Sequence, residues 1–290
     1  MAESFKPLRI TTDGAEINLV TGGEGPPLLL LHGYPQNLTL WRKILPRLGR
    51  HFTVVASDLR GYGDSSKPAG GDDHGGYSKR AMALDQLQVM NHLGFERFSV
   101  AGHDRGGRVA HRMALDHGDA VSRLAVLDIV PTHKLFTTAD KAFATAYYHW
   151  FFLIQPDDLP ETLIGADPAY YLDQLLGRWG QTEEAISPRA RAEYLRCFSD
   201  PAMIHASCED YRAAASIDLD HDDADLDRKI ACPLLGLWGM RGAMHRLYDL
   251  LDCWRERASD VRGQALDCGH YLPEERPEET ADALVEFFTD

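Results

Sequence analysis

The sequence lacks a long apolar run: its longest purely aliphatic stretch, residues 28–31, is too short to cross a bilayer. It is also short of positive charge, because 30 Lys and Arg against 44 Asp and Glu leave a net charge of −14. Nucleic acids and anionic membrane surfaces are bound by clustered Lys and Arg, so this balance argues against both as partners. A small anionic ligand would need local positive charge to bind against the overall field.

Cysteine is scarce and follows no pattern. The five cysteines are Cys197, Cys208, Cys232, Cys253 and Cys268. Their odd number and the lack of a C-x-x-C motif exclude a disulfide framework and a zinc site, and residues 1–10 lack an apolar signal core. We therefore expect reduced thiols, a cytoplasmic location and no bound metal.

Two segments resemble cofactor or metal sites in composition but lack the spacing that such sites require. Residues 22–25, GGEG, fail as a dinucleotide fingerprint because no G-x-G-x-x-G opens a helix there. The acidic residues 218–227 lack the glycine and ligand spacing of a calcium loop, and we interpret them as a solvated linker. The sequence therefore predicts no cofactor.

Short apolar runs alternate with helical patterns, which predicts an α/β fold with a mainly parallel sheet covered by helices on both faces. The predicted strands lie at residues 26–31, 52–56, 98–101, 124–130 and 233–238, with a last one that ends near Leu266. Between residues 134 and 225 only helix signals occur. We expect a core domain formed by residues 1–133 and 226–290, interrupted by a helical cap at 134–225.

The turn at residues 102–107, GHDRGG, directly follows the strand at residues 98–101 and opens a helix. This is the context of the nucleophile elbow, G-x-S-x-G, whose glycines permit a tight turn that presents the central side chain. Here that residue is Asp104. An aspartate could equally N-cap the helix, so the turn alone leaves both readings open.

Two further features favour catalysis. In this topology the loop after the first buried strand, HGYP at residues 32–35, supplies an oxyanion-hole N–H from Tyr34, and Arg105 N–H supplies the second. His270 follows the last strand, where the general base belongs in the chain order nucleophile, acid, histidine.

The acid is less obvious. It often follows the strand that here ends at Trp238, but no carboxylate occurs there until Asp249. Asp128 stands at the end of an earlier strand, and we assign it as the orienting acid; the alternative is a structural aspartate in a turn.

An aspartate nucleophile indicates a particular chemistry. A carboxyl group with an ordinary pKa near ~3.9 is ionised at neutral pH and can displace a leaving group from a saturated carbon. The resulting ester keeps a carbonyl that water can attack, with His270 as base and Asp128 orienting it. The sequence therefore predicts two-step hydrolysis at an sp3 carbon, with halide or an opened epoxide oxygen as leaving group.

Residues 32–36 (HGYPQ), 58–63 (DLRGYG) and 102–108 (GHDRGGR) resemble the haloacetate (fluoroacetate) dehalogenases of the α/β-hydrolase superfamily. The first two motifs are shared with epoxide hydrolases and haloalkane dehalogenases, whereas the third, with two arginines, is much more specific. The resemblance covers essentially the whole chain. It implies an α/β-hydrolase fold with a helical cap and conversion of fluoro-, chloro- or bromoacetate to glycolate and halide through an aspartyl ester.

The two arginines suit an anionic substrate. A 2-haloacid brings its carboxylate close to Asp104, and at about 4 Å with an effective dielectric near 20 this repulsion is worth roughly 4 kcal/mol. Arg105 and Arg108 are three residues apart on one helix and could clamp that carboxylate, ideally with bidentate geometry. The resemblance gives both this role; otherwise Arg108 would be read as a solvated helix residue.

The resemblance also implies which side chains hold the halide and close the site. It assigns the halide donors to His149, Trp150 and Tyr211, an aromatic patch that would otherwise be read as cap core. It places Trp179 over the site as a lid and implies a homodimer.

Two other functions fit the same residues. An epoxide hydrolase would use Asp104 and His270 with cap tyrosines as electrophiles, but Arg105 has no obvious role beside a neutral epoxide. The candidate tyrosines are Tyr147, Tyr148, Tyr170 and Tyr171. A binding protein could reuse the fold without turnover. A serine esterase is disfavoured because position 104 is not serine.

Overall fold

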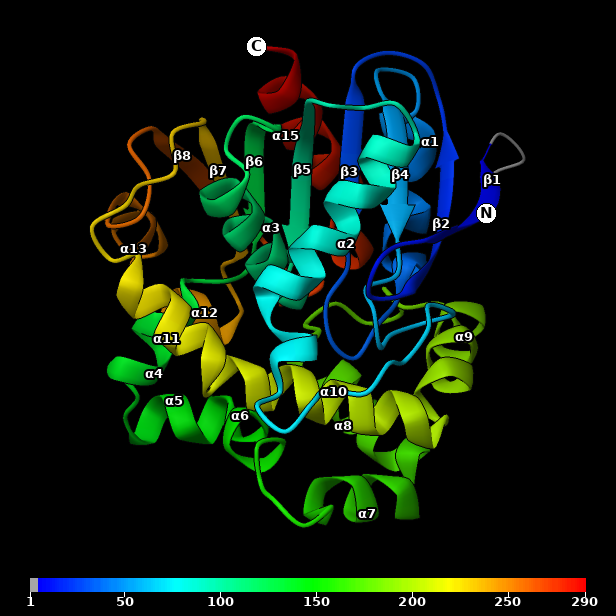
Figure 1. Ribbon diagram of the computed structural model, residues 1–290, viewed down its shortest axis with the longest axis vertical. Coiled ribbons are helices and arrows are strands. Elements are labelled where there is room, and N and C mark those ends of the chain that lie inside the picture. Colours follow the sequence, from blue (N-terminus) through cyan, green and yellow to red (C-terminus); the bar gives the residue numbers. More distant parts are fainter. Residues whose placement is uncertain (1–4) are drawn as a thin grey trace.

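The computed structural model describes residues 5–290, whose centre is one eight-stranded sheet (Figure 1). The strands are β1 Lys6–Thr11, β2 Glu16–Gly22, β3 Pro27–Leu31, β4 Thr53–Ser57, β5 Phe98–His103, β6 Val121–Leu127, β7 Leu234–Gly239 and β8 Val261–Leu266. Their order is β1-β2-β4-β3-β5-β6-β7-β8. From β4 to β8 every neighbouring pair is parallel, which confirms the predicted mainly parallel sheet.

The sequence did not predict the antiparallel edge formed by β1 and β2. For β1 the physical reason is exposure: within it only Ile10 is buried, so the strand carries neither an apolar run nor a strict alternation. Both β1 and β2 precede the first strand predicted from an apolar run, at residues 26–31.

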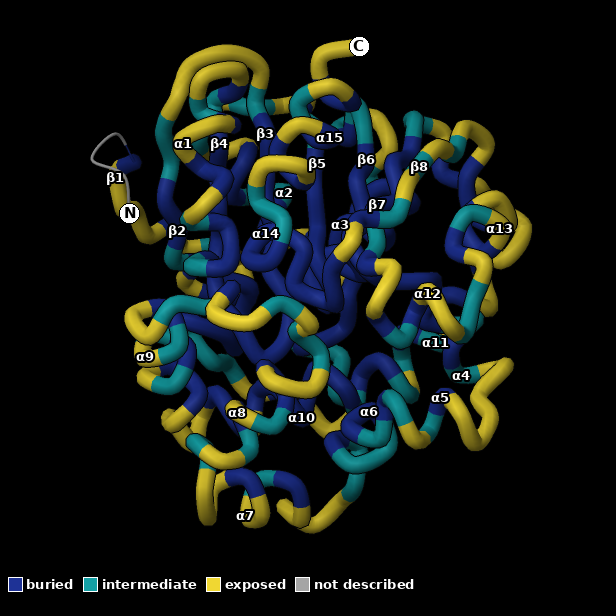
Figure 2. Tube along the Cα trace, turned by 180° about the vertical axis from the view of Figure 1, so that it is seen from behind, coloured by how far each residue is buried: buried dark blue, intermediate teal, exposed yellow. Residues whose placement is uncertain are grey.

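Helices cover both faces of the sheet and its carboxyl edge. They are η1 Leu38–Lys43, α1 Leu45–Leu48, η2 Gly75–Tyr77, α2 Lys79–His92, α3 Arg105–Asp116, α4 Thr132–Thr137, α5 Lys141–Ala146, α6 Tyr148–Phe152, α7 Leu159–Ala166, α8 Pro168–Trp179, α9 Pro188–Phe198, α10 Pro201–Ala214, α11 Ile217–Ala224, α12 Ala243–Leu247, α13 Leu250–Arg255, α14 Leu272–Glu275 and α15 Pro277–Thr289. Figure 1 shows α2 and α3 in front of the sheet, and Figure 2 shows its central strands as the most deeply buried part.

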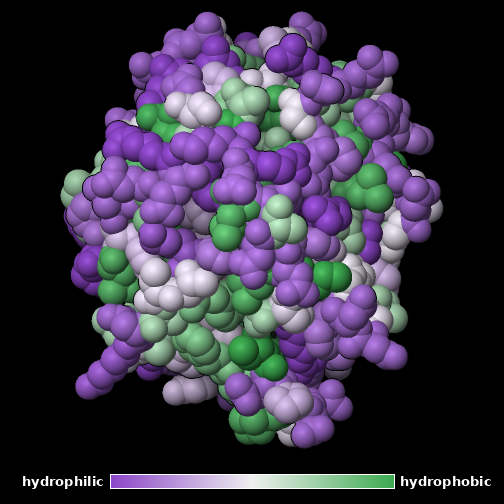
Figure 3. All heavy atoms as spheres, turned by 60° about the vertical axis from the view of Figure 1, so that its left-hand side comes forward, coloured by the Kyte–Doolittle hydropathy of each residue, from purple (hydrophilic) through white to green (hydrophobic). Residues whose placement is uncertain are grey.

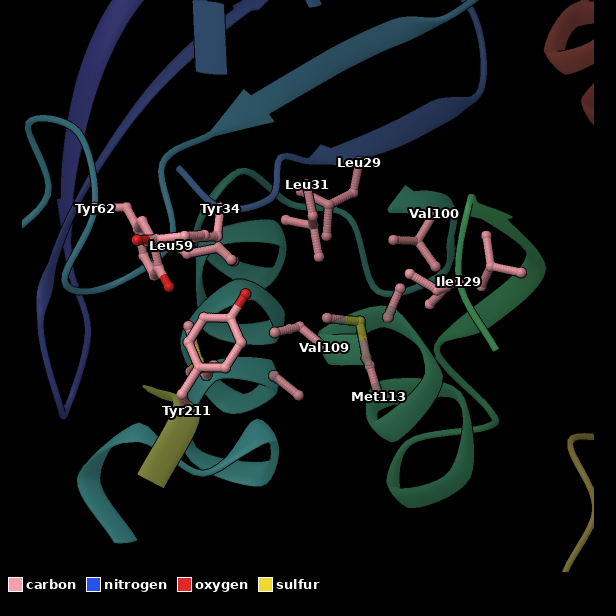
Figure 4. Packing of buried hydrophobic residues seen from close by; sticks show 14 of the residues in the cluster. Leu29, Leu31, Tyr34, Leu59, Tyr62, Val100, Val109, Met113, Ile129 and Tyr211 are labelled. Atoms are coloured by element: carbon pink, nitrogen blue, oxygen red, sulfur yellow. The ribbon is translucent and has the colours of Figure 1, made fainter. Parts of the chain in front are cut away.

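The core lies in two layers, one on each side of the sheet. On the α3 side, Leu29 and Leu31 of β3 and Val100 of β5 pack toward Val109 and Met113 (Figure 4). On the other side, alternate residues of the same strands pack against α1 and α15. A strand whose side chains are buried on both faces needs a continuous apolar run, which is why these strands could be read from the sequence.

Between β6 and β7 the chain forms only helices, α4 to α11, and these lie below the carboxyl ends of the strands in Figure 1. Two of these helices begin at a side-chain N-cap: the side chains of Ser187 and Asp200 accept hydrogen bonds from the first turns of α9 and α10. Figure 3 shows hydrophilic side chains over most of the sheet half of one face and a more apolar area over the helical half. No helix within residues 5–290 is long and apolar enough to span a membrane.

The acidic segment at residues 218–227 is not a solvated linker, and that interpretation is wrong. Most of it belongs to α11, and its Asp222 and Asp225 are buried. Arg112 of α3 donates to Asp222 at 2.7 Å and to Asp225 at 2.5 Å. The acidic residues therefore anchor the last helix before β7 to the sheet domain through a buried cation that is distant in sequence.

This anchor predicts the effect of Arg112→Ala. Within residues 5–290, removing the cation leaves the buried Asp222 without an ion-pair partner and leaves Asp225 with only the exposed Arg228 as a close partner, so the free energy of unfolding should fall by about 3–5 kcal/mol. Urea denaturation measures it. Arg228 is the matched control because it pairs with the same Asp225 from an exposed position, and Arg228→Ala should cost less than about 1 kcal/mol. Equal losses in the two variants would contradict the anchor.

Candidate active site

The turn between β5 and α3 holds Asp104 in a backbone conformation rare for an L-residue, with φ 46° and ψ −115°. Such a conformation persists only where the surrounding structure enforces it. Glycines make it possible. A Cβ on Gly106 would lie 2.4 Å from the carbonyl oxygen of His32, and a Cβ on Gly33 would lie 2.4 Å from the Cβ of Asp104. The turn and the loop after β3 are therefore packed too closely for any other residue.

The Asp104 side chain faces the loop after β3. It makes no capping hydrogen bond to α3, which argues against the capping reading. Instead, Tyr34 N–H donates to Asp104 Oδ1 at 3.0 Å, so this predicted oxyanion-hole donor already contacts the carboxylate. Burial raises the pKa of Asp104, but the positive charges of His270, Arg108 and Arg105 outweigh it and leave the pKa below its ordinary value. The buried side chain is an ionised carboxylate.

The structure brings His270 and Asp128 together. Asp128 Oδ2 lies 2.6 Å from His270 Nδ1, and Asp128 Oδ1 accepts the Gly239 N–H at the end of β7. The carboxylate after β6 thus reaches across the end of β7, where the sequence offers no acid. Burial lowers the pKa of His270, but the hydrogen bond and charge of Asp128 outweigh it and raise the pKa above the ordinary value.

Arg105 is completely buried, and Asp210 of α10 holds most of it. Its Nε and Nη2 donate to the two Asp210 carboxylate oxygens at 2.9 and 2.7 Å, and its Nη2 also reaches the Asp210 carbonyl. The bidentate face of this guanidinium is therefore occupied within the protein. Its Nη1 has no hydrogen-bonding partner among residues 5–290. Arg105 can offer a ligand only this one nitrogen.

Arg108 is also buried, so the reading of a solvated helix residue is wrong. Its Nη1 donates to Val130 O and Thr132 Oγ1, whereas its Nε has no partner in the described chain. Burial and then the charge of Arg105 lower the pKa of Arg108 to about 10, so it stays protonated at neutral pH. Asp104 therefore faces two cations that each keep a buried nitrogen unpaired.

The three predicted halide donors cluster beside these arginines. The guanidinium carbon of Arg105 lies 4.1 Å from the centre of the Tyr211 ring, and that of Arg108 lies 4.6 Å from the centre of the Trp150 ring. The Tyr211 ring is 5.6 Å from the His149 ring and 5.4 Å from the Tyr34 ring (Figure 4 shows the two tyrosines). The cation–π contacts fix the aromatic rings relative to the guanidinium groups.

These donors are buried and unpaired. Within residues 5–290, His149 Nδ1, Trp150 Nε1 and Tyr211 Oη have no hydrogen-bonding partner. Burial raises the pKa of Tyr211, and the charge of Asp104 raises it further, so the hydroxyl keeps its proton. Burial lowers the pKa of His149 to about 3, so its ring is neutral. Unpaired buried polar groups are costly and rare, and a cluster of them indicates a ligand site.

Trp179 lies between this cluster and the base. Its ring is 4.5 Å from that of His149 and 5.6 Å from that of His270. Its carbonyl accepts the His270 N–H at 2.9 Å, so the end of α8 is tied to the loop that carries the base. Trp179 contacts both halves of the site.

Sequence reasoning missed Asp210, which adjoins Tyr211 in residues 209–212. Besides Arg105 it binds Lys79 of α2, and the hydroxyl of Tyr62 donates to it at 2.6 Å. Burial raises its pKa, but Arg105 and Lys79 outweigh that and hold the pKa well below the ordinary value. Charge alone could not single it out among 44 acidic residues.

Elsewhere within residues 5–290, one group of side chains has metal-ligand geometry: Asp158, Glu161 and His205. Asp158 and His205 are exposed, and Glu161 is already paired with Arg212 at 2.7 Å. This group indicates a surface ion-pair network, and we assign it no metal.

A family model described as alpha/beta hydrolase fold matches residues 26–277. A fluoroacetate dehalogenase from Burkholderia sp. is 48% identical over 100% of this chain and 96% of its own length. A soluble epoxide hydrolase from Corynebacterium sp. (strain C12) is 37% identical over 95% of this chain and 94% of its own. A crystal structure of an alpha/beta hydrolase from Nostoc sp PCC 7120 superimposes with a TM-score of 0.99 at 62% identity, covering 100% and 99% of the two chains.

The His270–Asp128 pair predicts a histidine pKa that depends on one carboxylate. In Asp128→Asn a hydrogen bond remains possible but the negative charge is gone, so burial should bring the pKa of His270 below its value in the unchanged protein. An NMR titration of the imidazole C–H signals, assigned with His270→Gln, measures the change. Asp267→Asn, an exposed carboxylate near the same loop, is the control. An unchanged pKa in Asp128→Asn would refute the pairing.

Proposed function

This chain belongs to the α/β-hydrolase fold family, and we propose that it is a dehalogenase that hydrolyses a haloacetate to glycolate and halide. One observation carries the proposal: an ionised carboxylate, Asp104, lies in a buried site with two arginines and three aromatic side chains that keep unpaired polar atoms. A substrate that carries both a carboxylate and a halogen satisfies all of these groups, because the carboxylate binds the arginines and the halogen accepts from the aromatic side chains. The 48% identical fluoroacetate dehalogenase supports the same activity.

In the first step Asp104 attacks the halogen-bearing carbon. A carboxylate oxygen forms a C–O bond, the carbon–halogen bond breaks, and the electron pair leaves with the halide, giving an aspartyl ester. Arg105 Nη1 and Arg108 Nε hold the substrate carboxylate with one nitrogen from each arginine, and they offset its repulsion from Asp104. The predicted clamp is therefore shared between two side chains.

The departing halide carries the developing negative charge. His149, Trp150 and Tyr211 stabilise it with N–H and O–H groups that make no competing bond within residues 5–290. Their burial keeps water from weakening these contacts. Fluoride leaves carbon poorly, so its cleavage demands all three donors together.

In the second step water hydrolyses the ester. Neutral His270 removes a proton from water, the hydroxide attacks the Asp104 carbonyl carbon, and the N–H groups of Tyr34 and Arg105 stabilise the oxyanion. The intermediate then collapses: the bond between that carbon and the glycolate oxygen breaks, the oxygen takes the proton from the imidazolium, and glycolate leaves. The restored Asp104 carboxyl group loses its remaining proton to solvent. Asp128 stabilises the imidazolium that forms. Because the pKa of His270 is raised, this step gains speed as the pH rises above the ordinary histidine range.

An epoxide hydrolase is the alternative, and the 37% identical relative from Corynebacterium supports it. It would use the same Asp104 and His270. Arg105 alone does not discriminate, because its ion pair with Asp210 would serve either enzyme. The unpaired nitrogens on Arg105 and Arg108 favour the dehalogenase over the epoxide hydrolase, since a neutral epoxide gives them no partner. Halide release from chloroacetate, compared with diol formation from styrene oxide, decides between the two.

The remaining attributes follow the same proposal. The protein acts as a core of residues 1–133 and 226–290 with a helical cap at 134–225, on a small anionic 2-haloacid and water. The five cysteines are all free thiols, which supports a cytoplasmic location. Exposed apolar side chains on α7 and α8, Leu163 and Tyr170, support a homodimer.

The two-step mechanism predicts that His270→Ala traps the ester. With chloroacetate this variant should release one equivalent of chloride and then stop, because the base for the second step is missing. Mass spectrometry should find a carboxymethyl group on a peptide that contains Asp104. Asp104→Asn is the control and should show neither burst nor adduct. If His270→Ala shows neither the chloride burst nor the carboxymethyl adduct, the two-step mechanism is wrong.

The ion pair between Asp210 and Arg105 predicts a role in substrate positioning. In Asp210→Asn the guanidinium of Arg105 loses its fixed orientation, and kcat/KM for chloroacetate should fall on the order of 100-fold, largely through KM. Asp218→Asn is the matched control, because Asp218 contacts Lys79 but not Arg105. Equal losses in both variants would assign Asp210 to stability alone.

A further inference from the structure

A cavity of about 200 Å³ reaches the site from the protein surface. It lies between the α5–α6 junction, the end of α8 and the start of α12, and α12 packs against α5. His270 and Trp179 line its inner part. Because Asp104 and both site arginines are at most 4% exposed, a substrate has to enter through an opening of this kind.

The lining of this cavity, which we call the mouth, has an unusual charge. Apart from His270, the only side chains of its lining within residues 5–290 that are charged at neutral pH are three arginines, Arg178, Arg241 and Arg246, and no Asp or Glu lines it. The chain as a whole holds more acidic than basic residues, with a net charge of −14. The mouth is therefore a local reversal of the overall field.

Two of these arginines are not neutralised. Arg241 forms a two-pronged ion pair with Asp267 at 2.7 and 2.6 Å. Arg178 and Arg246 have no carboxylate within 4.0 Å among residues 5–290. The Nη1 of Arg246 donates to the Arg241 carbonyl at 2.9 Å, which fixes its guanidinium at the mouth. Unpaired exposed cations act on a passing anion without having to break an existing pair.

The mouth also connects to the reacting groups. Arg178 directly precedes Trp179, whose ring contacts both His149 and His270. An anion attracted to Arg178 thus arrives beside the indole that separates the surface from the halide donors. In solution at physiological salt, charges act over roughly 8 Å, so arginines at the rim influence entry while distant charges are screened.

We propose that this mouth is the entrance for small anions, and that Arg178 and Arg246 draw carboxylate substrates and halide past Trp179 against the repulsion of an acidic protein. Electrostatic attraction of this kind raises association rates and fades with added salt. The substrate class rests on the proposed function, whereas the anion preference of the mouth rests on its own charges.

Fluorescence quenching tests the mouth without turnover. Iodide is an anionic quencher and acrylamide a neutral one, and the signal of Trp179 is the difference between the protein and its Trp179→Phe variant. In the double variant Arg178→Gln/Arg246→Gln, the iodide quenching constant should fall about fivefold at low salt, with acrylamide quenching unchanged. The control Arg255→Gln/Arg262→Gln removes the same charge from exposed positions on α13 and β8.

Kinetics with chloroacetate tests the consequence for catalysis. The Arg178→Gln/Arg246→Gln variant should lose about fivefold in kcat/KM at low salt, with kcat retained and the loss vanishing at high salt. Iodide quenching that stays the same, or falls equally in the control, overturns the proposal. If iodide quenching falls as expected but neither the unchanged protein nor any variant releases halide from a haloacid, the mouth is confirmed as an anion entrance and the proposed dehalogenase function is wrong.

Discussion

Burying the charge of Asp104 is the constraint on which the rest of the structure depends. A carboxylate removed from water must be compensated by hydrogen bonds and nearby cations. Asp104 receives the Tyr34 N–H and faces Arg105 and Arg108. Arg105 is itself a completely buried cation and requires Asp210. One buried charge in a turn thus organises an ionic network that runs from the sheet domain into α10.

The network explains how the site stays ready for an anion. Because Asp210 takes two nitrogens of Arg105 and backbone and hydroxyl oxygens take Arg108 Nη1, both guanidinium groups are held still without being used up. Tyr211 and Trp150 pack against these guanidinium groups and His149 packs against Tyr211, so their unpaired polar atoms have fixed positions. Donors fixed before the reaction stabilise a developing charge without reorganising during it.

Much of the fold and the nucleophile turn could be predicted from the sequence, because each depends on residues that are close together in the chain. Strands buried on both faces give apolar runs, so the central strands β3, β4, β5, β6 and β7 were recognisable, and the glycines around Asp104 revealed a turn too tight for side chains. The exposed strand β1 gave no such signal. The acidic segment at 218–227 was misread because its partner Arg112 is distant in the chain.

The sequence by itself determined the residue types of the chemistry: an aspartate in a nucleophile turn, a histidine after the last strand and arginines three positions apart. Only the tertiary structure decided which nitrogens are available. Asp210 occupies the fork of Arg105, and Asp128 at the end of β6 reaches across β7 to His270, which follows β8. These two pairings join residues 105 and 142 positions apart. Burial, which makes each of them necessary, is a property of the folded chain alone.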